Sequence, residues 1–331
     1  MADAILSQLI LLALLLPCPL DAGWTKELET QLPDHSGGYS AIHYDQRGHR
    51  IWLLSDLPDG NLSAWTMPSQ LNSPRLLMSV PLKVPGDISQ QLDAEALVID
   101  GEEAWVASEG RRSNERPAQL LRFSFPRGVF LQAVSLPAAW QPSPEQGLES
   151  NAGPESLARL SRPDQPLALL MAAERPLRQG PADQVPLLRW HWPAGHESQR
   201  DAPLATPQGA LRAPAGGGWG LTDLVVVHAL DARAPQLLSL WRRYRDPLQW
   251  ENQLRLYPLP AAGEVAESLQ TWDLKTLGIT PENWEGLSFG PELSPGQPSL
   301  LLVSDDNRNP LQSSRLVQLR ARRLPGCEVK R

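Results

Sequence analysis

A repeat that occurs five times is the feature that most constrains the fold of this chain. In each copy an acidic or hydroxyl residue opens a short apolar segment, and in four of the five a second acid closes the next segment. The copies begin near residues 40, 95, 155, 223 and 285, so the period is 55 to 68 residues. A regular period of this length predicts a repeat architecture.

Each copy has the composition of one small β-sheet. Two apolar runs of four to eight residues are followed by a third, such as 119–125, and in the second copy by a fourth at 128–134. Runs of this length between turn signals are typical of strands, and the 33 prolines and 24 glycines suit a chain dense in turns. We therefore predict an all-β propeller of five or six blades, each a four-stranded antiparallel sheet. Residues 24–39 or 180–220 either close the ring or supply a sixth blade. A β-sandwich also has many short strands, but the regular period favours the propeller.

Hairpin geometry gives the acids of the repeat a common location. The start of the first strand and the end of the second lie at the same edge of an antiparallel hairpin. This predicts three pairs of neighbouring acids: Glu95 with Glu109, Glu155 with Glu174, and Glu285 with Asp305. Because the first strand of a blade normally lines the central channel, we expect the acids of several blades to converge on one channel mouth.

Crowded carboxylates raise one another's pKa or recruit a cation. Hard oxygen donors suit Ca²⁺ or Mg²⁺, and Ca²⁺ is the cofactor that we predict. The predicted metal ligands are Glu95, Glu109, Glu155, Glu174, Asp223, Glu285, Asp305, Asp306 and Asn307. The alternative for each acid is a local role, in which it accepts hydrogen bonds from backbone N–H groups of the tight loops between blades.

The formal net charge of −7 argues against a nucleic-acid partner, because phosphate backbones are bound by clustered Lys and Arg. Three arginines near the acidic motifs, Arg111, Arg112 and Arg243, are candidates for holding an anionic substrate. The alternative is that they are solvated side chains of loops. We expect a monomer that acts on a small molecule.

The first 22 residues are predicted to be a signal peptide. Residues 9–16 are an apolar run of signal-peptide size, too short to span a bilayer, although no Lys or Arg precedes it and Asp3 does. Residues 23–331 would then form one exported domain, periplasmic or secreted, without a transmembrane span. Cys18 leaves lipidation as a minor alternative. After cleavage only Cys327 remains, which excludes an intrachain disulfide.

Two local patterns resemble a serine-hydrolase motif and a zinc site, but neither is complete. Residues 286–290 match the G-x-S-x-G elbow of serine hydrolases, but Pro291 follows and no histidine lies after Ser288, so neither the helix nor the triad can form. His191 and His196 lack further ligands at zinc spacing. The sequence also contains no glycine-rich phosphate loop and no dinucleotide fingerprint.

The repeat motifs resemble those of the phytase-like family, described as "esterase-like activity of phytase". The resemblance extends from about residue 37 to 320, and 283–289 (NWEGLSF) with 301–307 (LLVSDDN) are its most specific parts. It implies a bacterial, mostly exported β-propeller that hydrolyses phosphoric or carboxylic esters, by analogy with calcium-dependent propeller phytases. The chain departs from the family where the fourth repeat's second strand should close on a Glu. It reads Trp241-Arg242-Arg243 there, so a fully populated metal cluster is in doubt.

Two functions follow from these patterns. The first is hydrolysis of a phosphoric or carboxylic ester with a divalent cation, with Glu95, Glu109, Glu155 and Glu285 as catalytic residues. The second is a non-catalytic propeller that binds a ligand or a protein and in which Ca²⁺ is structural.

Overall fold

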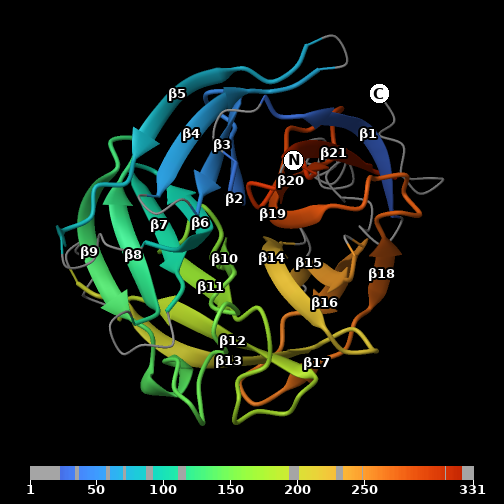
Figure 1. The fold of residues 1–331 in the computed structure, drawn as a ribbon. Helices are drawn as coiled ribbons and strands as arrows, with labels where there is room; N and C mark the ends of the chain where they lie inside the picture. Colours follow the sequence, from blue (N-terminus) through green and yellow to red (C-terminus); the bar gives the residue numbers. More distant parts are fainter. Residues whose placement is uncertain are drawn as a thin grey trace, which may run out of the picture.

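The chain folds into a closed ring of five β-sheets around a central axis (Figure 1). The computed structural model describes residues 23–33, 37–56, 60–69, 72–86, 92–110, 117–193, 201–228, 234–247, 249–309 and 311–322. The predicted signal peptide, Arg111, Arg112 and both cysteines lie outside these ranges. Within them no helix is long and apolar enough to cross a membrane. The structure confirms the all-β propeller and fixes the number of blades at five.

The first two blades follow the predicted order of strands from the axis outward. Blade 1 consists of β2 (Tyr39–Asp45), β3 (Arg50–Ser55), β4 (Asn61–Thr66) and β5 (Leu76–Pro81). Blade 2 consists of β6 (Ala94–Asp100), β7 (Glu103–Ser108), β8 (Gln119–Ser124) and β9 (Val129–Ser135). All pairings within these two sheets are antiparallel. A short 3₁₀ turn, η2 (Ala138–Trp140), leads into the third blade.

Blades 3 and 4 are linked by one short strand, which lies between two strands of blade 4 in the sequence but adds to the sheet of blade 3. Blade 3 consists of β10 (Ser156–Arg159), β11 (Ala168–Ala172), β12 (Gln184–His191) and β13 (Leu204–Arg212). Blade 4 consists of β14 (Trp219–Val227), β15 (Gln236–Arg245), β16 (Gln249–Pro258) and β18 (Gln270–Asp273). Between β16 and β18 the chain adds β17 (Val265–Ala266) as a parallel fifth strand outside β13. The stretch 180–220 therefore supplies outer strands of blade 3 and not a sixth blade.

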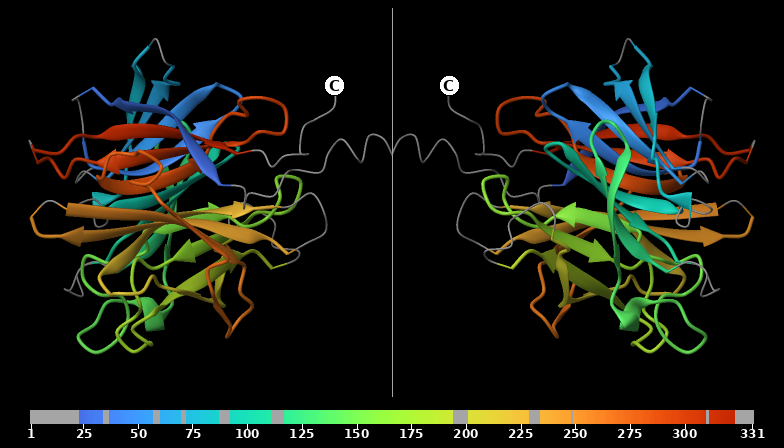
Figure 2. Two further views of the ribbon diagram at one scale, coloured as in Figure 1. Left: turned by 90° about the vertical axis from the view of Figure 1, so that its right-hand side faces the viewer. Right: turned by 90° about the vertical axis from the view of Figure 1, so that its left-hand side faces the viewer.

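The ring is closed by the two ends of the domain. Blade 5 has β19 (Asn283–Phe289), β20 (Ser299–Asp305) and β21 (Arg315–Ala321) from the C-terminal part. Its outermost strand is β1 (Trp24–Gln31), the first strand of the chain, which pairs antiparallel with β21. The inner strands contact one another in the order β2, β6, β10, β14, β19 and back to β2. In side view the strands of blade 4 run across the thickness of the disc, so each hairpin loop lies on one of its two faces (Figure 2).

The core lies between neighbouring blades, which explains the unbroken apolar runs of the repeat. In β3, Ile51 and Leu53 pack with blade 5, whereas Trp52 packs with blade 2, because successive side chains of a strand point to opposite faces. β20 behaves in the same way, with Leu300 facing blade 4 and Leu301 facing blade 1. A sheet that is buried on both faces needs apolar residues at successive positions.

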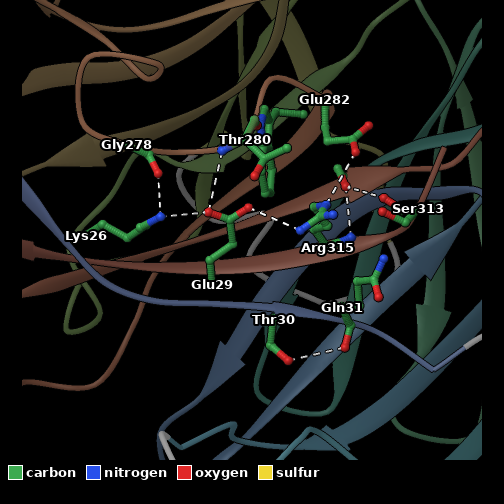
Figure 3. Close-up of polar contacts among 11 residues, drawn as sticks. Lys26, Glu29, Thr30, Gln31, Gly278, Thr280, Glu282, Ser313 and Arg315 are labelled. Carbon is green, nitrogen blue, oxygen red and sulfur yellow. Dashed lines mark hydrogen bonds and ion pairs between the residues drawn. The ribbon is translucent and has the colours of Figure 1, made fainter.

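Ion pairs secure the closing strand. Arg315 of β21 lies between two little-exposed carboxylates and bridges Glu29 of β1 and Glu282, each at 3.3 Å (Figure 3). Glu29 also accepts from Lys26 at 3.0 Å and from the backbone N–H of Thr280 at 3.4 Å. These contacts join the first strand to the last strand and to the loop before β19.

The Arg315→Gln variant should lose stability, because Glu282 and one oxygen of Glu29 would remain poorly solvated without their cation. We expect a decrease of about 1–3 kcal/mol in the free energy of unfolding, measured by urea denaturation. Arg320→Gln is the matched control on the same strand. Its pair with Glu27 is more exposed, so the loss should be below about 1 kcal/mol. Equal effects of the two substitutions would contradict the role of Arg315 in closing the ring.

Candidate functional site

The opening position of the repeat is a β-bulge at the mouth of the channel. The strand register shifts between Tyr39 and Ala41, Ala94 and Ala96, Leu221 and Asp223, and Trp284 and Gly286. The bulged residues are therefore Ser40, Glu95, Thr222 and Glu285, and in blade 3 Glu155 directly precedes β10. A bulge turns a side chain out of the pleated sheet, and here it occurs at the same place in four inner strands.

The two hydroxyls at this position tie neighbouring blades together. Ser40 donates to the carbonyl of Ala94 at 2.5 Å, and Thr222 donates to the carbonyl of Trp284 at 3.0 Å. Each bond joins one inner strand to the inner strand of the next blade. Of the three opening glutamates, Glu285 accepts from Arg242 of the neighbouring blade, and all three form the centre of the acidic cluster.

The closing position of the repeat lies beside the opening position, as the hairpin geometry predicts. The backbone N–H groups of Asp56, Glu109 and Glu174 donate to carbonyls two residues before the opening position, at 2.8, 2.9 and 2.8 Å. In blade 5, Asp305 pairs with Asn283 in the register of β19 and β20. Carboxylates of blades 1, 2, 3 and 5 thus reach the same edge of the ring.

Two glycines leave room for closing acids to cross onto the next blade. A Cβ atom at Gly153 would collide with the side chain of Glu109, and one at Gly220 would collide with that of Glu174. Each acid therefore lies over the start of the neighbouring inner strand. This places the acids of blades 2 and 3 within one continuous cluster.

The tightest group of acids comes from blade 2. One oxygen each of Asp93, Glu95 and Glu109 lie within 4.8 Å of one another. Burial, followed by the charge of Asp93, raises the pKa of Glu109 to about 8. The same causes raise the pKa of Glu95 well above its ordinary value. These donors are all hard oxygens, and their ionised form is unfavourable without a counter-charge, so they fit a Ca²⁺ or Mg²⁺ ion.

Glu155 connects this group with the rest of the mouth. Burial raises the pKa of Glu155 well above its ordinary value, and the charges of Glu95, Glu174, Glu285 and Glu109 add to the rise in that order. These neighbours come from blades 2, 3 and 5. The cluster therefore surrounds the axis and does not belong to a single hairpin.

Asp56 and Asp305 form the remaining edge, between blades 5 and 1. Burial, followed by the charges of Asp305 and Asp93, raises the pKa of Asp56 to about 7. The pKa of Asp305 is also raised, chiefly by burial. Asn283 donates to Asp305 at 3.4 Å and links this edge to the next feature of the site.

An arginine occupies the closing position of blade 4, where the other blades carry an acid. Arg242 pairs with Gly220 in the register of β14 and β15, as Asp305 pairs with Asn283 in blade 5. Its guanidinium donates to Glu285 and to the amide oxygen of Asn283, and it lies 3.3 Å from Glu174. Burial tends to raise the pKa of Glu285, and this guanidinium opposes the rise. In the fourth repeat an arginine thus takes the place of the missing acid, and it is held among the acids of blades 3 and 5.

Two further arginines near the motifs have different surroundings. Arg175 lies 3.6 Å from Glu174 at a more exposed position. Arg243, a predicted substrate-binding residue, stacks over Trp219 with its guanidinium carbon 4.6 Å from the ring centre. It also pairs with Glu251. The structure therefore brings Arg242, and not Arg243, to the acids.

Three predicted metal ligands make local hydrogen bonds. Asp223 accepts from the backbone N–H of Leu224 at 2.8 Å and of Leu287 at 2.7 Å, so it joins blades 4 and 5. Asp306 accepts from Ser314 at 3.1 Å and from the backbone of Arg308 at 2.9 Å. Asn307 donates to Gln312 at 3.3 Å. For these three, the alternative of a local role describes the observed contacts.

The sequence prediction omitted four residues of the site: Asp56, Asp93, Arg242 and Asn283. Asp56 and Asp93 occupy repeat positions that the alignment of the copies already showed. The signal for Arg242 was its register with the acids at the ends of the other second strands. Which of the adjacent residues Arg242 and Arg243 reaches the acids depends on the face of β15 that each side chain occupies.

The comparisons with known proteins agree with the fold and with the repeat motifs. The phytase-like family, described as "esterase-like activity of phytase", matches residues 34–308. A comparison with curated proteins finds no match by sequence. Among solved structures, RS223 beta-xylosidase is 10% identical with a TM-score of 0.50, and the match covers 88% of this chain and 94% of that one. A glucose dehydrogenase is also 10% identical with a TM-score of 0.47, covering 88% and 98%. At 10% identity the likeness to the beta-xylosidase concerns the fold alone.

Arg242→Gln should destabilise the protein strongly, since Glu285 and Glu174 would remain buried without their cation. We expect a loss of about 3–5 kcal/mol near pH 8 and a smaller loss near pH 5, where Glu285, whose pKa is raised to about 8, can take up a proton. Arg243→Gln removes the same charge from the adjacent residue and should have little effect, because its partner is more exposed. If the Arg242 variant loses little stability at both pH values, the acids do not need this cation.

The stability of the metal-free protein should decrease as the pH rises from about 4.5 to about 8. An unfolded glutamate loses its proton near its ordinary pKa of 4.5, whereas Glu109 keeps its proton up to a pKa of about 8. Asp56 behaves in the same way up to a pKa of about 7. The folded state therefore binds more protons in this interval, which makes the free energy of unfolding fall. Urea denaturation in EDTA across this range tests the slope, and Ca²⁺ should flatten it. A slope of the opposite sign would refute the buried cluster.

Proposed function

The chain belongs to the phytase-like family described as "esterase-like activity of phytase", and from this we propose that it hydrolyses phosphoric or carboxylic esters with a divalent cation, preferably Ca²⁺, at the acidic channel mouth. The observation that carries the proposal is the convergence of Asp93, Glu95 and Glu109, whose oxygens lie within 4.8 Å of one another. A bound cation would screen the negative charge of the ester and lower the pKa of a coordinated water.

The residues of the mouth divide into three roles in this proposal. Asp93, Glu95 and Glu109 hold the cation. Glu285 and Glu174 hold Arg242, whose side chain is 17% exposed and supplies positive potential toward an anionic substrate. Glu155 lies between the two groups, and its burial raises its pKa well above the ordinary value. A carboxyl group of this kind can donate a proton to a leaving oxygen.

A second candidate function is a binding propeller whose acids are structural. The observation in its favour is the pairing of Arg242 with Glu174 and Glu285, which already balances part of the cluster from within the chain. The proposals of export to the periplasm or medium, of a monomeric state and of substrate contacts by Arg111 and Arg112 accompany the hydrolase function. Each rests on the sequence.

Glu95→Gln tests the hydrolase proposal, because it keeps the shape of the ligand and removes its charge. In the wild type we expect Ca²⁺ to raise the melting temperature and to permit hydrolysis of p-nitrophenyl phosphate or p-nitrophenyl acetate, and we expect EDTA to abolish both effects. The variant should lose the Ca²⁺-dependent rise and at least about 100-fold of the activity. Glu292→Gln, an exposed acid on a loop, is the control and should behave as wild type.

The outcomes separate the two functions. A Ca²⁺-dependent rise in melting temperature without hydrolysis of either ester would favour the binding propeller. No response of the wild type to Ca²⁺ or EDTA in either measurement would overturn the metal site itself. Glu155→Gln should slow hydrolysis of an alkyl phosphate more than that of p-nitrophenyl phosphate, because only the poorer leaving group needs a proton.

A further inference from the structure

A second cavity lies between blades 3 and 4, at the strand ends opposite the acidic mouth. It has a volume of about 640 Å³. Its walls come from the end of β10, the end of β12 and the residue after β14, whereas the acids stand at the starts of β10 and β14. Since these are the opposite ends of β10 and β14, which are neighbours in the ring, the cavity lies on the other face of the disc from the acids.

The charged side chains on this wall are basic. Arg162 and Arg189 line the cavity together with His191 and His228, and no carboxylate lines it among the described residues. Arg189 is exposed, and the structure gives its guanidinium no ion pair with the described residues. Burial, followed by the charges of Arg162 and Arg159, lowers the pKa of His228, which reflects positive potential at this wall.

Two imidazole nitrogens of the residues that line the cavity have no hydrogen-bond partner among the described residues. They are Nδ1 of His191 and Nε2 of His228, and neither atom is exposed to solvent. A buried polar atom without a partner is unfavourable, so a ligand or water that bonded to these atoms would be stabilised. Both histidines stand on the same cavity wall as the two arginines.

The remaining wall is apolar and already ordered. Leu160, Leu167 and Leu259 line it, and Trp192 closes one side. The indole N–H of Trp192 donates to the carbonyl of Asp201 at 3.0 Å, and its ring packs edge-on against Trp105 with 5.2 Å between centres. Since these contacts fix the ring, binding a flat or aliphatic group against it would cost little side-chain entropy.

We propose that this cavity binds a small organic anion, whose carboxylate or phosphate group bonds to Arg162 and Arg189 and whose apolar body rests against Trp192 and the leucines. Arginine suits both oxyanions because its planar guanidinium can bond two oxygens at once. The net charge of −7 makes the basic wall a local feature and not part of a broad basic surface, which favours a small ligand over a polyanion.

Binding of three probes of similar size tests the proposal by isothermal titration calorimetry in EDTA. Phenyl phosphate and benzoate carry the two oxyanions on one ring, and benzyl alcohol carries no charge. EDTA keeps the acidic mouth free of divalent cations, so that face should repel both anions. We expect at least one of the anions to bind at millimolar concentration or below and benzyl alcohol to bind at least tenfold more weakly.

Arg189→Gln should weaken anion binding at least tenfold, because a bond between charged groups is lost at an exposed residue whose replacement leaves the core intact. Arg127→Gln removes the same charge from an exposed turn of blade 2 and should leave binding unchanged. Whichever anion binds more tightly identifies the oxyanion. The proposal would be overturned if neither anion binds, if benzyl alcohol binds equally well, or if the two variants have the same effect.

This inference is independent of the proposed hydrolase. The Ca²⁺-dependent hydrolysis measured at the acidic mouth should be unchanged in Arg189→Gln, and anion binding in EDTA should be unchanged in Glu95→Gln. Failure of one site therefore leaves the result for the other intact.

Discussion

The acids of the channel mouth can share a small volume only if positive charge lies among them. Five inner strands begin at one rim, and the bulge that turns a side chain out of four of these strands brings glutamates from different blades together. Arg242 balances part of this charge from within the chain by bonding to Glu285 and Glu174. Asp93, Glu95 and Glu109 place three carboxylate oxygens within 4.8 Å of one another, which is unfavourable while they are all ionised unless positive charge lies close by. The mouth thus has one group of acids around a fixed arginine and a second group that fits a cation.

The repeat predicted the architecture because every blade obeys the same two structural constraints. Each blade buries both faces, so the sequence of its strands is an unbroken apolar run. Each hairpin returns to the same rim, so Glu109 and Asp305 could be placed beside the opening positions. The register shifts could not be predicted, because a bulge adds one residue without changing the pattern of apolar positions. For this reason Asp223 was expected in the cluster, whereas the bulge falls at Thr222 and leaves Asp223 bonded to the backbone of the next blade. Arg243 was the candidate for holding a substrate, whereas Arg242 is the neighbour that bonds to the acids, and the sequence does not show which face of β15 each side chain occupies.

The propeller determines where chemistry can occur but not which chemistry it is. A beta-xylosidase has a similar arrangement of blades at 10% identity, so the sheets alone carry no information on substrate. What distinguishes this chain is the set of side chains on its two faces. One rim is acidic and buried, and the opposite face has a basic cavity between blades 3 and 4 whose charged lining is Arg162 and Arg189. An acidic rim and a local basic cavity on the opposite face can hold ligands of opposite sign without competition between them.

The position of β1 in blade 5 has a consequence for the order of events during synthesis. β1 is the first strand of the domain to leave the ribosome, and its partner β21 is the last. Blades 1 to 4 can form in sequence, since domains fold from the N-terminus as the chain emerges. Until β21 emerges, β1 has no partner strand, and Trp24, which is fully buried in the folded protein, lacks the surface that covers it. Such an edge can pair with another chain, so the nascent protein is most vulnerable to aggregation just before its final strand appears.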